Sequence, residues 1–173
     1  GAIYNTDETC LDFDSDVYTI PVFTSGLTEG EMFVIVRINT EAGQNGGFHK
    51  FGVSSNQHYN WSNGHIYENF GSDNGRPSWN PTEDLTEYVI YNVSAEASNW
   101  NARINGTVDH YWTGEPTVAW GASNTIGTST WGTWSGGHIQ EFLFFDEVLS
   151  DEQRYSVNNY LSLKWELGSM VDS

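Results

Sequence analysis

The sequence predicts an all-β protein, an antiparallel β-sandwich closed by one C-terminal α-helix. Short alternating or apolar runs, about ten in all, recur between Gly-, Asn- and Ser-rich segments. Aromatic residues, which favour strands, make up 15% of the chain. Convincing helical spacing begins only after Ser150. Since we find no internal repeat and no linker, we expect a single domain over residues 1–173.

The first two predicted strands, Leu11–Phe13 and Val17–Ile20, flank a turn that is rich in aspartate. Asp12, Asp14 and Asp16 have a spacing that suits Ca²⁺ ligands. However, neither the Gly nor the bidentate Glu of an EF-hand loop follows them. Turn formation is therefore the preferred interpretation, with Ca²⁺ binding as the alternative, and no other cofactor is predicted.

The middle of the chain combines strong strands with a long, unusual loop. Glu31–Ile38 has a continuous apolar centre, which predicts a strand covered on both faces. Phe48–Val53 is the next predicted strand. Residues 54–79 are dense in Asn, Gly and aromatics and predict a loop with a short strand near His65–Phe70. Long ordered loops on a β-scaffold commonly carry recognition.

The later strands are marked by alternation and by one turn signal. They are predicted at Leu85–Ser94, Trp100–Ile104, Thr107–Trp112 and Thr117–Trp120. Asn105-Gly106 joins two of them and predicts a tight hairpin. Residues 121–137, rich in Gly, Ser and Thr, predict a loop, and a buried strand follows from Gly137.

The C-terminal helix has a well-defined start. Ser150 and Gln153 form the S-x-x-Q pattern of a capping box. Asp151 and Glu152 place negative charge in the first turn, where the helix dipole favours it. Helical spacing predicts one apolar face made of Val157, Tyr160, Leu161 and the Lys164 stem.

Several of these residues also resemble a known family. Gly137-His138-Ile139-Gln140-Glu141, then Leu149-Ser150-Asp151-Glu152-Gln153-Arg154, and then Tyr160-Leu161 and Lys164-Trp165 resemble the C-terminal signature of laminin-G-like, concanavalin A-like jelly-roll domains. This resemblance implies an antiparallel jelly-roll β-sandwich (concanavalin A-like). Residues 58–71 with Arg76 are similar to a segment of such domains in structural proteins of tailed phages, particularly marine ones.

Composition narrows the classes of partner. Acidic residues outnumber basic ones by 23 to 6, for a net charge of −17. A chain this acidic is not expected to bind nucleic acid or anionic membrane surfaces. No stretch of about 18 apolar residues predicts membrane insertion. Cys10 is the one cysteine, so no intrachain disulfide is expected.

The aromatic residues of the loops are the candidates for ligand binding. Sugar sites combine aromatic faces, which cover the apolar face of a pyranose, with polar groups for its hydroxyls. The candidates are Tyr59, Trp61, Trp79, Trp112, Trp131 and Trp134. For each ring, packing in the core or in a subunit interface is the alternative. His58 and His65 share the aromatic loop, and either a ligand contact or a structural role is open to them.

Catalysis is not expected. Retaining glycoside hydrolases need two carboxylates about 5 Å apart, and families with this fold use a Glu-x-Asp-x-x-Glu run that the sequence lacks. Glu29 and Glu31 have no third acid beside them, and the family signature accounts for Glu141.

Three functions remain as hypotheses. The first is a non-catalytic structural, decoration or adhesion protein on the virion surface of a tailed phage, which assembles with itself or with other virion proteins and contacts host glycans. The second is a lectin-like carbohydrate-binding module of a secreted or cell-surface protein, with an extracellular location. The third, and the least favoured, is a glycoside hydrolase.

Overall fold

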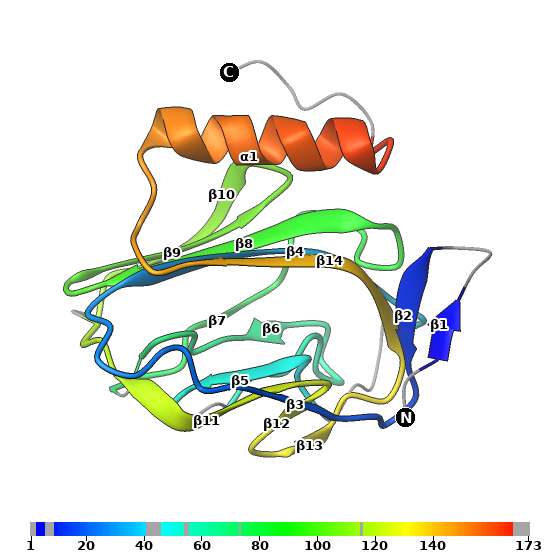
Figure 1. Ribbon diagram of the computed structural model, residues 1–173, viewed down its shortest axis with the longest axis horizontal. Coiled ribbons are helices and arrows are strands. Elements are labelled where there is room, and N and C mark those ends of the chain that lie inside the picture. The colour runs from blue at the N-terminus through cyan, green and yellow to red at the C-terminus, as the bar shows by residue number, and fades with distance from the viewer. Residues whose placement is uncertain are drawn as a thin grey trace.

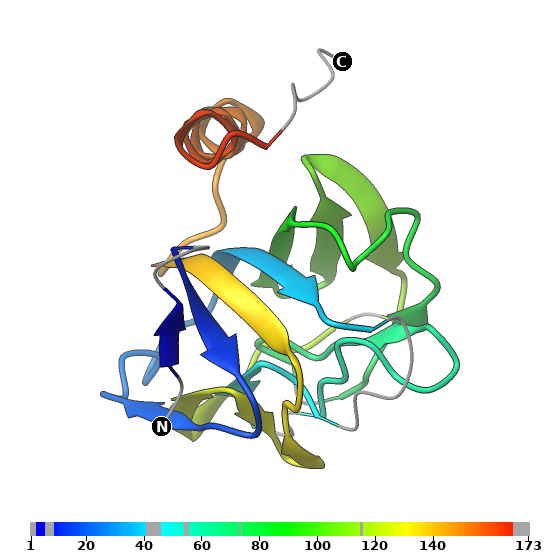
Figure 2. The same ribbon diagram turned by 90° about the vertical axis from the view of Figure 1, so that its right-hand side faces the viewer.

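The protein is an antiparallel β-sandwich with one helix on its outer face. The computed structural model describes residues 3–5, 9–40, 46–53, 56–72, 74–114 and 116–167. A large sheet lies between the C-terminal helix and a second layer of smaller sheets (Figure 1). Figure 2 looks along the helix, which lies over the large sheet on the side away from the small ones. The predicted fold class is therefore confirmed.

All strand pairs between the described elements are antiparallel. In spatial order, the seven-stranded sheet contains β1 (Ile3–Asn5), β2 (Cys10–Phe13), β14 (Gly137–Phe145), β4 (Gly30–Ile38), β8 (Val89–Glu96), β9 (Asn99–Ile104) and β10 (Thr107–Trp112). The second layer contains the three-stranded sheet β3 (Tyr18–Ile20), β11 (Trp120–Ile126) and β5 (His49–Gly52). Two short pairs complete it: β6 (Ile66–Tyr67) with β7 (Ser78–Trp79), and β12 (Thr128–Ser129) with β13 (Gly132–Thr133).

Strand β4 shows how one sequence serves two cores. Met32 and Val34 belong to the main core between the two layers, whereas Phe33 and Ile35 belong to a smaller cluster with Leu161 of the helix. Alternate side chains of a strand point to opposite faces, so an unbroken apolar run fills both clusters. Each such side chain contributes about 1.5–3 kcal/mol when it is fully buried. The prediction of a strand covered on both faces is confirmed.

Helix α1 (Asp151–Lys164) begins as predicted, and Val157 and Leu161 pack against the sheet as predicted, but the rest of its buried face differs. Both hydrogen bonds of the Ser150–Gln153 capping box are present. The prediction of an apolar face that includes Tyr160 is wrong, because Tyr160 is 48% exposed and the buried residues are Arg154, Asn158, Leu161 and Ser162. The reason lies in the sheet beneath, where a buried carboxylate requires a cation.

That carboxylate is Glu31 of β4, which has no exposed surface. Arg154 binds it in a fork, with Nε 2.7 Å from Oε1 and Nη2 3.1 Å from Oε2. The Leu149 amide also donates to Glu31 at 2.9 Å, and the Val148 amide donates to Glu29 at 3.0 Å. These bonds, which we call the helix anchor, tie the start of α1 to β4.

Among the remaining predicted elements, one hairpin is confirmed and one loop is wrong. The Asn105-Gly106 hairpin is confirmed, and both residues have the positive φ, 51° and 82°, that a type I′ turn requires. The prediction of a loop over residues 121–137 is wrong, because β11, β12 and β13 begin in or just before it. Trp120 and Ile126 at the ends of β11 pack against the core, but the residues between them are small or polar. The strand therefore lacks an alternating apolar pattern, and backbone pairing with both β3 and β5 defines it.

The three aspartates near the N-terminus are not part of a cluster of potential metal ligands in the described residues. Asp12 lies beside His138, with 3.6 Å between its Oδ1 and Nε2, and Asp14 is exposed in the turn. In the described ranges, no group of three or more His, Cys, Asp and Glu side chains is placed to hold a metal ion, Asp16 included. The same ranges contain no helix long and apolar enough to cross a membrane.

Candidate binding site: an aromatic pocket with an arginine

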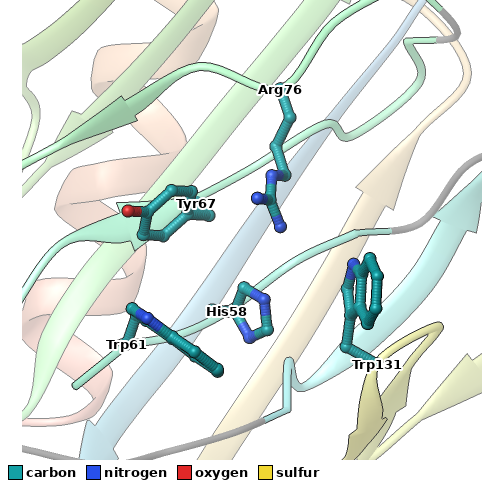
Figure 3. Close-up of a pocket in the computed structure, with 5 residues that line it drawn as sticks. All are labelled: His58, Trp61, Tyr67, Arg76 and Trp131. Atoms are coloured by element: carbon teal, nitrogen blue, oxygen red, sulfur yellow. The ribbon is translucent and has the colours of Figure 1, made fainter. Parts of the chain in front are cut away.

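A pocket of about 460 Å³ opens on the second layer of the sandwich. Figure 3 shows five described residues that line it, His58, Trp61, Tyr67, Arg76 and Trp131. Its volume lies within the usual range for small-molecule sites, about 300–1,000 Å³. We call it the aromatic pocket.

Residues 58–67 form a hairpin-like loop that positions three of the lining side chains. The His58 amide donates to the Tyr67 carbonyl at 2.9 Å, and the Tyr67 amide returns a bond to the His58 carbonyl at 3.0 Å. At the tip, the Trp61 amide donates to the His65 carbonyl at 2.9 Å. Gly64 closes the turn with φ of 83°, a conformation that favours glycine. The loop is therefore held by its own backbone.

The core supports this loop from below. Tyr59 is fully buried, next to His58 in sequence, and its ring packs against Phe48 and Tyr91. The indole Nε1 of Trp134, which is also fully buried, donates to the Tyr59 carbonyl at 2.9 Å. The backbone between His58 and Trp61 is thus fixed to the interior.

A buried carboxylate supports the loop from its other end. Glu68 directly follows Tyr67 and has no exposed surface. Its oxygens accept bonds from His49 Nε2 at 3.1 Å, Gln57 Nε2 at 2.6 Å, Tyr91 Oη at 3.1 Å and the amides of Asn69 and Phe70 at 2.9 and 3.0 Å. Burial raises the pKa of Tyr91 well above its usual value, and the nearby Glu68 charge raises it further. A buried charge is stable only where hydrogen-bond partners of this kind compensate for its lost hydration.

Within the pocket, rings and a cation lie against one another. The ring centroids of His58 and Trp61 are 4.3 Å apart, and those of His58 and Tyr67 are 5.7 Å apart in an edge-to-face arrangement. The guanidinium carbon of Arg76 lies 4.6 Å from the centroid of the Tyr67 ring, within the range of a cation–π contact. Partial burial lowers the pKa of Arg76 from its usual value.

The opposite wall of the pocket comes from a distant part of the chain. Trp131 lies in the turn between β12 and β13 and is 63% exposed. Figure 3 shows its ring across the pocket from Tyr67, with the Arg76 side chain entering between them. An exposed tryptophan is unremarkable alone, but here it stands at the edge of a concave aromatic surface.

The structure divides the six predicted candidates. Trp61 and Trp131 line the pocket. Tyr59, Trp79 and Trp134 are in the core, with at most 7% exposed, so their prediction as ligand contacts is wrong. Trp112 is half-buried, lies outside the lining and packs edge-on against Trp100.

A shared physical reason explains the buried indoles. A buried tryptophan needs a partner for its N–H group, and Trp79 donates to Asp109 at 2.5 Å while stacking on His110. Trp134 has the Tyr59 carbonyl. Tyr67 and Arg76 are not among the predicted ligand contacts. The sequence signal for both is their place in the segment, residues 58–71 with Arg76, that resembles phage structural proteins.

Comparisons with known proteins identify the fold but no family. No family model and no curated protein matches this sequence. Among solved structures, the receptor-binding domain of botulinum neurotoxin C/D mosaic serotype is 14% identical, with a TM-score of 0.71 over 94% of this chain and 45% of that one. The binding domain of botulinum neurotoxin DC, solved with rat synaptotagmin II, is 15% identical, with a TM-score of 0.64 over 93% and 45%.

A sialidase of Trypanosoma rangeli is 11% identical, with a TM-score of 0.62 over 90% of this chain and 28% of that one. The chain therefore spans less than half of each of these structures. At such low identity the likeness shows the fold alone, an all-β sandwich.

Proposed function

We propose that this domain is a non-catalytic glycan-binding module and that the aromatic pocket is its binding site. The observation that carries the proposal is the meeting of Trp61, Tyr67 and Trp131 around one pocket with His58 and Arg76. Flat rings cover the apolar face of a pyranose, while imidazole and guanidinium nitrogens bond to its hydroxyls. The structurally similar domain of botulinum neurotoxin C/D is a receptor-binding domain, which supports the use of this fold for recognition.

The surroundings of the acids support a non-catalytic role. Most glycoside hydrolases use a pair of carboxyl groups that flank the scissile bond. Among the described residues, those that line the pocket include neither Asp nor Glu. Glu31 and Glu68 are committed to buried hydrogen bonds. Glu141 accepts from Trp165 Nε1 at 2.5 Å and pairs with Lys164 at 2.9 Å.

A glycan array with pocket variants tests the proposal. We expect saturable binding of at least one glycan by the wild type and a loss of about tenfold or more in affinity for Trp61→Ala and for Trp131→Ala, because each removes a face of the site. Tyr155→Ala is the matched control. Tyr155 is 57% exposed on α1, across the sandwich from β12 and β13 (Figure 1). A blank array, or an equal loss in all three variants, contradicts the proposal.

For context, we infer a place on the virion surface of a tailed phage, where the domain assembles with itself or with other virion proteins. The likeness of residues 58–71 to phage structural proteins motivates this, and an extracellular module is the alternative. Exposed apolar side chains outside the pocket suit protein contacts; they include Val22, Phe23, Val53 and Leu163. Co-sedimentation with capsid or tail components is expected. A chain that stays monomeric and binds no virion component contradicts the inference.

A further inference from the structure

The aromatic pocket contains a cation on a strongly acidic protein. Only six residues are Lys or Arg, against 23 acids. Arg154 is bound to Glu31, Lys164 to Glu141, and Arg103 is buried with bonds to Asn92 and Ser94. Arg76 instead is exposed and lines a pocket.

The contacts of Arg76 orient it while leaving much of its bonding capacity toward the pocket. A guanidinium has five N–H donors. One nitrogen, Nη1, donates to the Asn56 carbonyl at 3.0 Å, and the planar group lies against the Tyr67 ring. Among the described residues, no carboxylate forms an ion pair with Arg76. In Figure 3 the guanidinium projects into the space between Tyr67, His58 and Trp131.

Tyr67 is itself held in place, so the cation has a fixed support. The Tyr67 hydroxyl accepts a bond from Asn63 Nδ2 at 3.0 Å, and its backbone is paired with His58. The neighbouring Glu68 is bonded in the core. A prealigned planar donor beside aromatic faces suits a ligand that presents a planar acceptor at the edge of a flat ring.

Resting on the proposed function, we propose that the aromatic pocket selects glycans that carry a carboxylate, with the acidic sugar ring against Trp61 or Trp131 and its carboxylate on Arg76. A carboxylate matches the guanidinium fork in two parallel hydrogen bonds. A neutral sugar offers only hydroxyls to the same group. A cationic ligand is disfavoured, because Arg76 already occupies the Tyr67 face.

The net charge distinguishes carboxylated sugars from densely sulfated ones. The field of a protein with charge −17 repels an anionic ligand in proportion to the ligand's own charge. A ligand with one charge per acidic sugar meets less repulsion than a polysulfate, while its carboxylate still reaches Arg76. The pocket should therefore prefer single carboxylates to multiple sulfates.

Matched glycan pairs test this inference by calorimetric titration. The probes are trigalacturonate with its carboxyl-reduced trisaccharide, sialyllactose with lactose, and sulfated maltotriose with maltotriose. We expect at least one carboxylated probe to bind about tenfold or more tightly than its neutral counterpart. Arg76→Gln should abolish that preference, and Arg76→Lys should retain only part of it, because lysine keeps the charge but loses the fork. Tyr155→Ala should behave as the wild type.

Each other outcome is decisive. Equal binding of acidic and neutral partners, unchanged in Arg76→Gln, overturns the carboxylate inference and leaves glycan binding intact. Binding of the sulfated probe alone also overturns it. If neither these probes nor a broad glycan array is bound by the wild type, the proposed function fails as well. Unchanged thermal melting of Arg76→Gln shows that a loss of preference does not arise from unfolding.

Discussion

The helix anchor and the aromatic pocket are each built around an arginine, and the two arginines differ in what is left for a ligand. Arg154 is 6% exposed and bonds to Glu31, to Asp151 and to the Leu149 carbonyl at 2.6 Å. Arg76 is exposed, bonds to one backbone carbonyl and lies on a tyrosine ring.

This difference distinguishes an arginine that supports the fold from an arginine that can bind a ligand. Arg154 binds the buried Glu31 and the Leu149 carbonyl as well as the exposed Asp151. Its removal therefore leaves Glu31 as an uncompensated buried charge. Arg76 compensates no buried carboxylate among the described residues. Its removal should therefore affect what the pocket binds and leave the fold largely unchanged.

The largest expected effect is on the helix anchor. Arg154→Ala should lower the free energy of unfolding by about 3–5 kcal/mol, because removing one partner of a buried ion pair leaves the other charge buried without compensation. Urea denaturation followed by tryptophan fluorescence measures this. A loss below about 1 kcal/mol would show that the anchor is not a principal support of the helix.

Urea denaturation of a pocket variant should show a much smaller change in the free energy of unfolding. Arg76→Gln removes an exposed cation–π contact and one hydrogen bond, so the free energy of unfolding should fall by about 1 kcal/mol or less. A loss comparable to that of Arg154→Ala would make Arg76 a structural residue and remove the contrast between the two sites.

The smallest effect concerns Glu141, at the far end of the helix from the anchor. Burial alone would raise the pKa of Glu141, but hydrogen bonds from Lys164, Trp165 and Tyr160 outweigh it and hold the pKa below its usual 4.5. A lowered folded-state pKa stabilises the fold above the unfolded-state pKa, and this contribution is lost as the pH falls through the lower value.

The difference in unfolding free energy between wild type and Glu141→Gln should therefore shrink from pH 7 to pH 3. Denaturation curves at both pH values measure it. A difference that grows toward low pH would have the wrong sign for a carboxylate held in its charged form.

Local interactions account for what could be predicted. The Ser150–Gln153 capping box and the Asn105-Gly106 turn join residues a few positions apart, so their chemistry is visible in the sequence. The apolar run of β4 likewise requires cover on both faces, whatever provides it. Strand β11 escaped prediction because its pattern is polar and its order comes from two distant partners.

The tryptophans show most clearly what could not be predicted from the sequence. Trp61 and Trp131 lie at the pocket, whereas Trp79 and Trp134 are in the core, although all four come from similar surroundings of Asn, Gly, Ser and Thr. What separates them is which carbonyl or carboxylate each indole meets, and that depends on how the layers stack. Composition alone cannot distinguish these outcomes.

The β-sandwich, the terminal helix with its cap and the aromatic-rich loop can be predicted from the sequence, because strand alternation and capping act over short distances. The contact of Arg154 with a buried Glu31, and the position of Arg76 in a pocket completed by Trp131, arise from the tertiary fold. Burial and partner choice depend on residues brought together from distant parts of the chain. The same residue type therefore supports the fold in one place and is open to a ligand in the other.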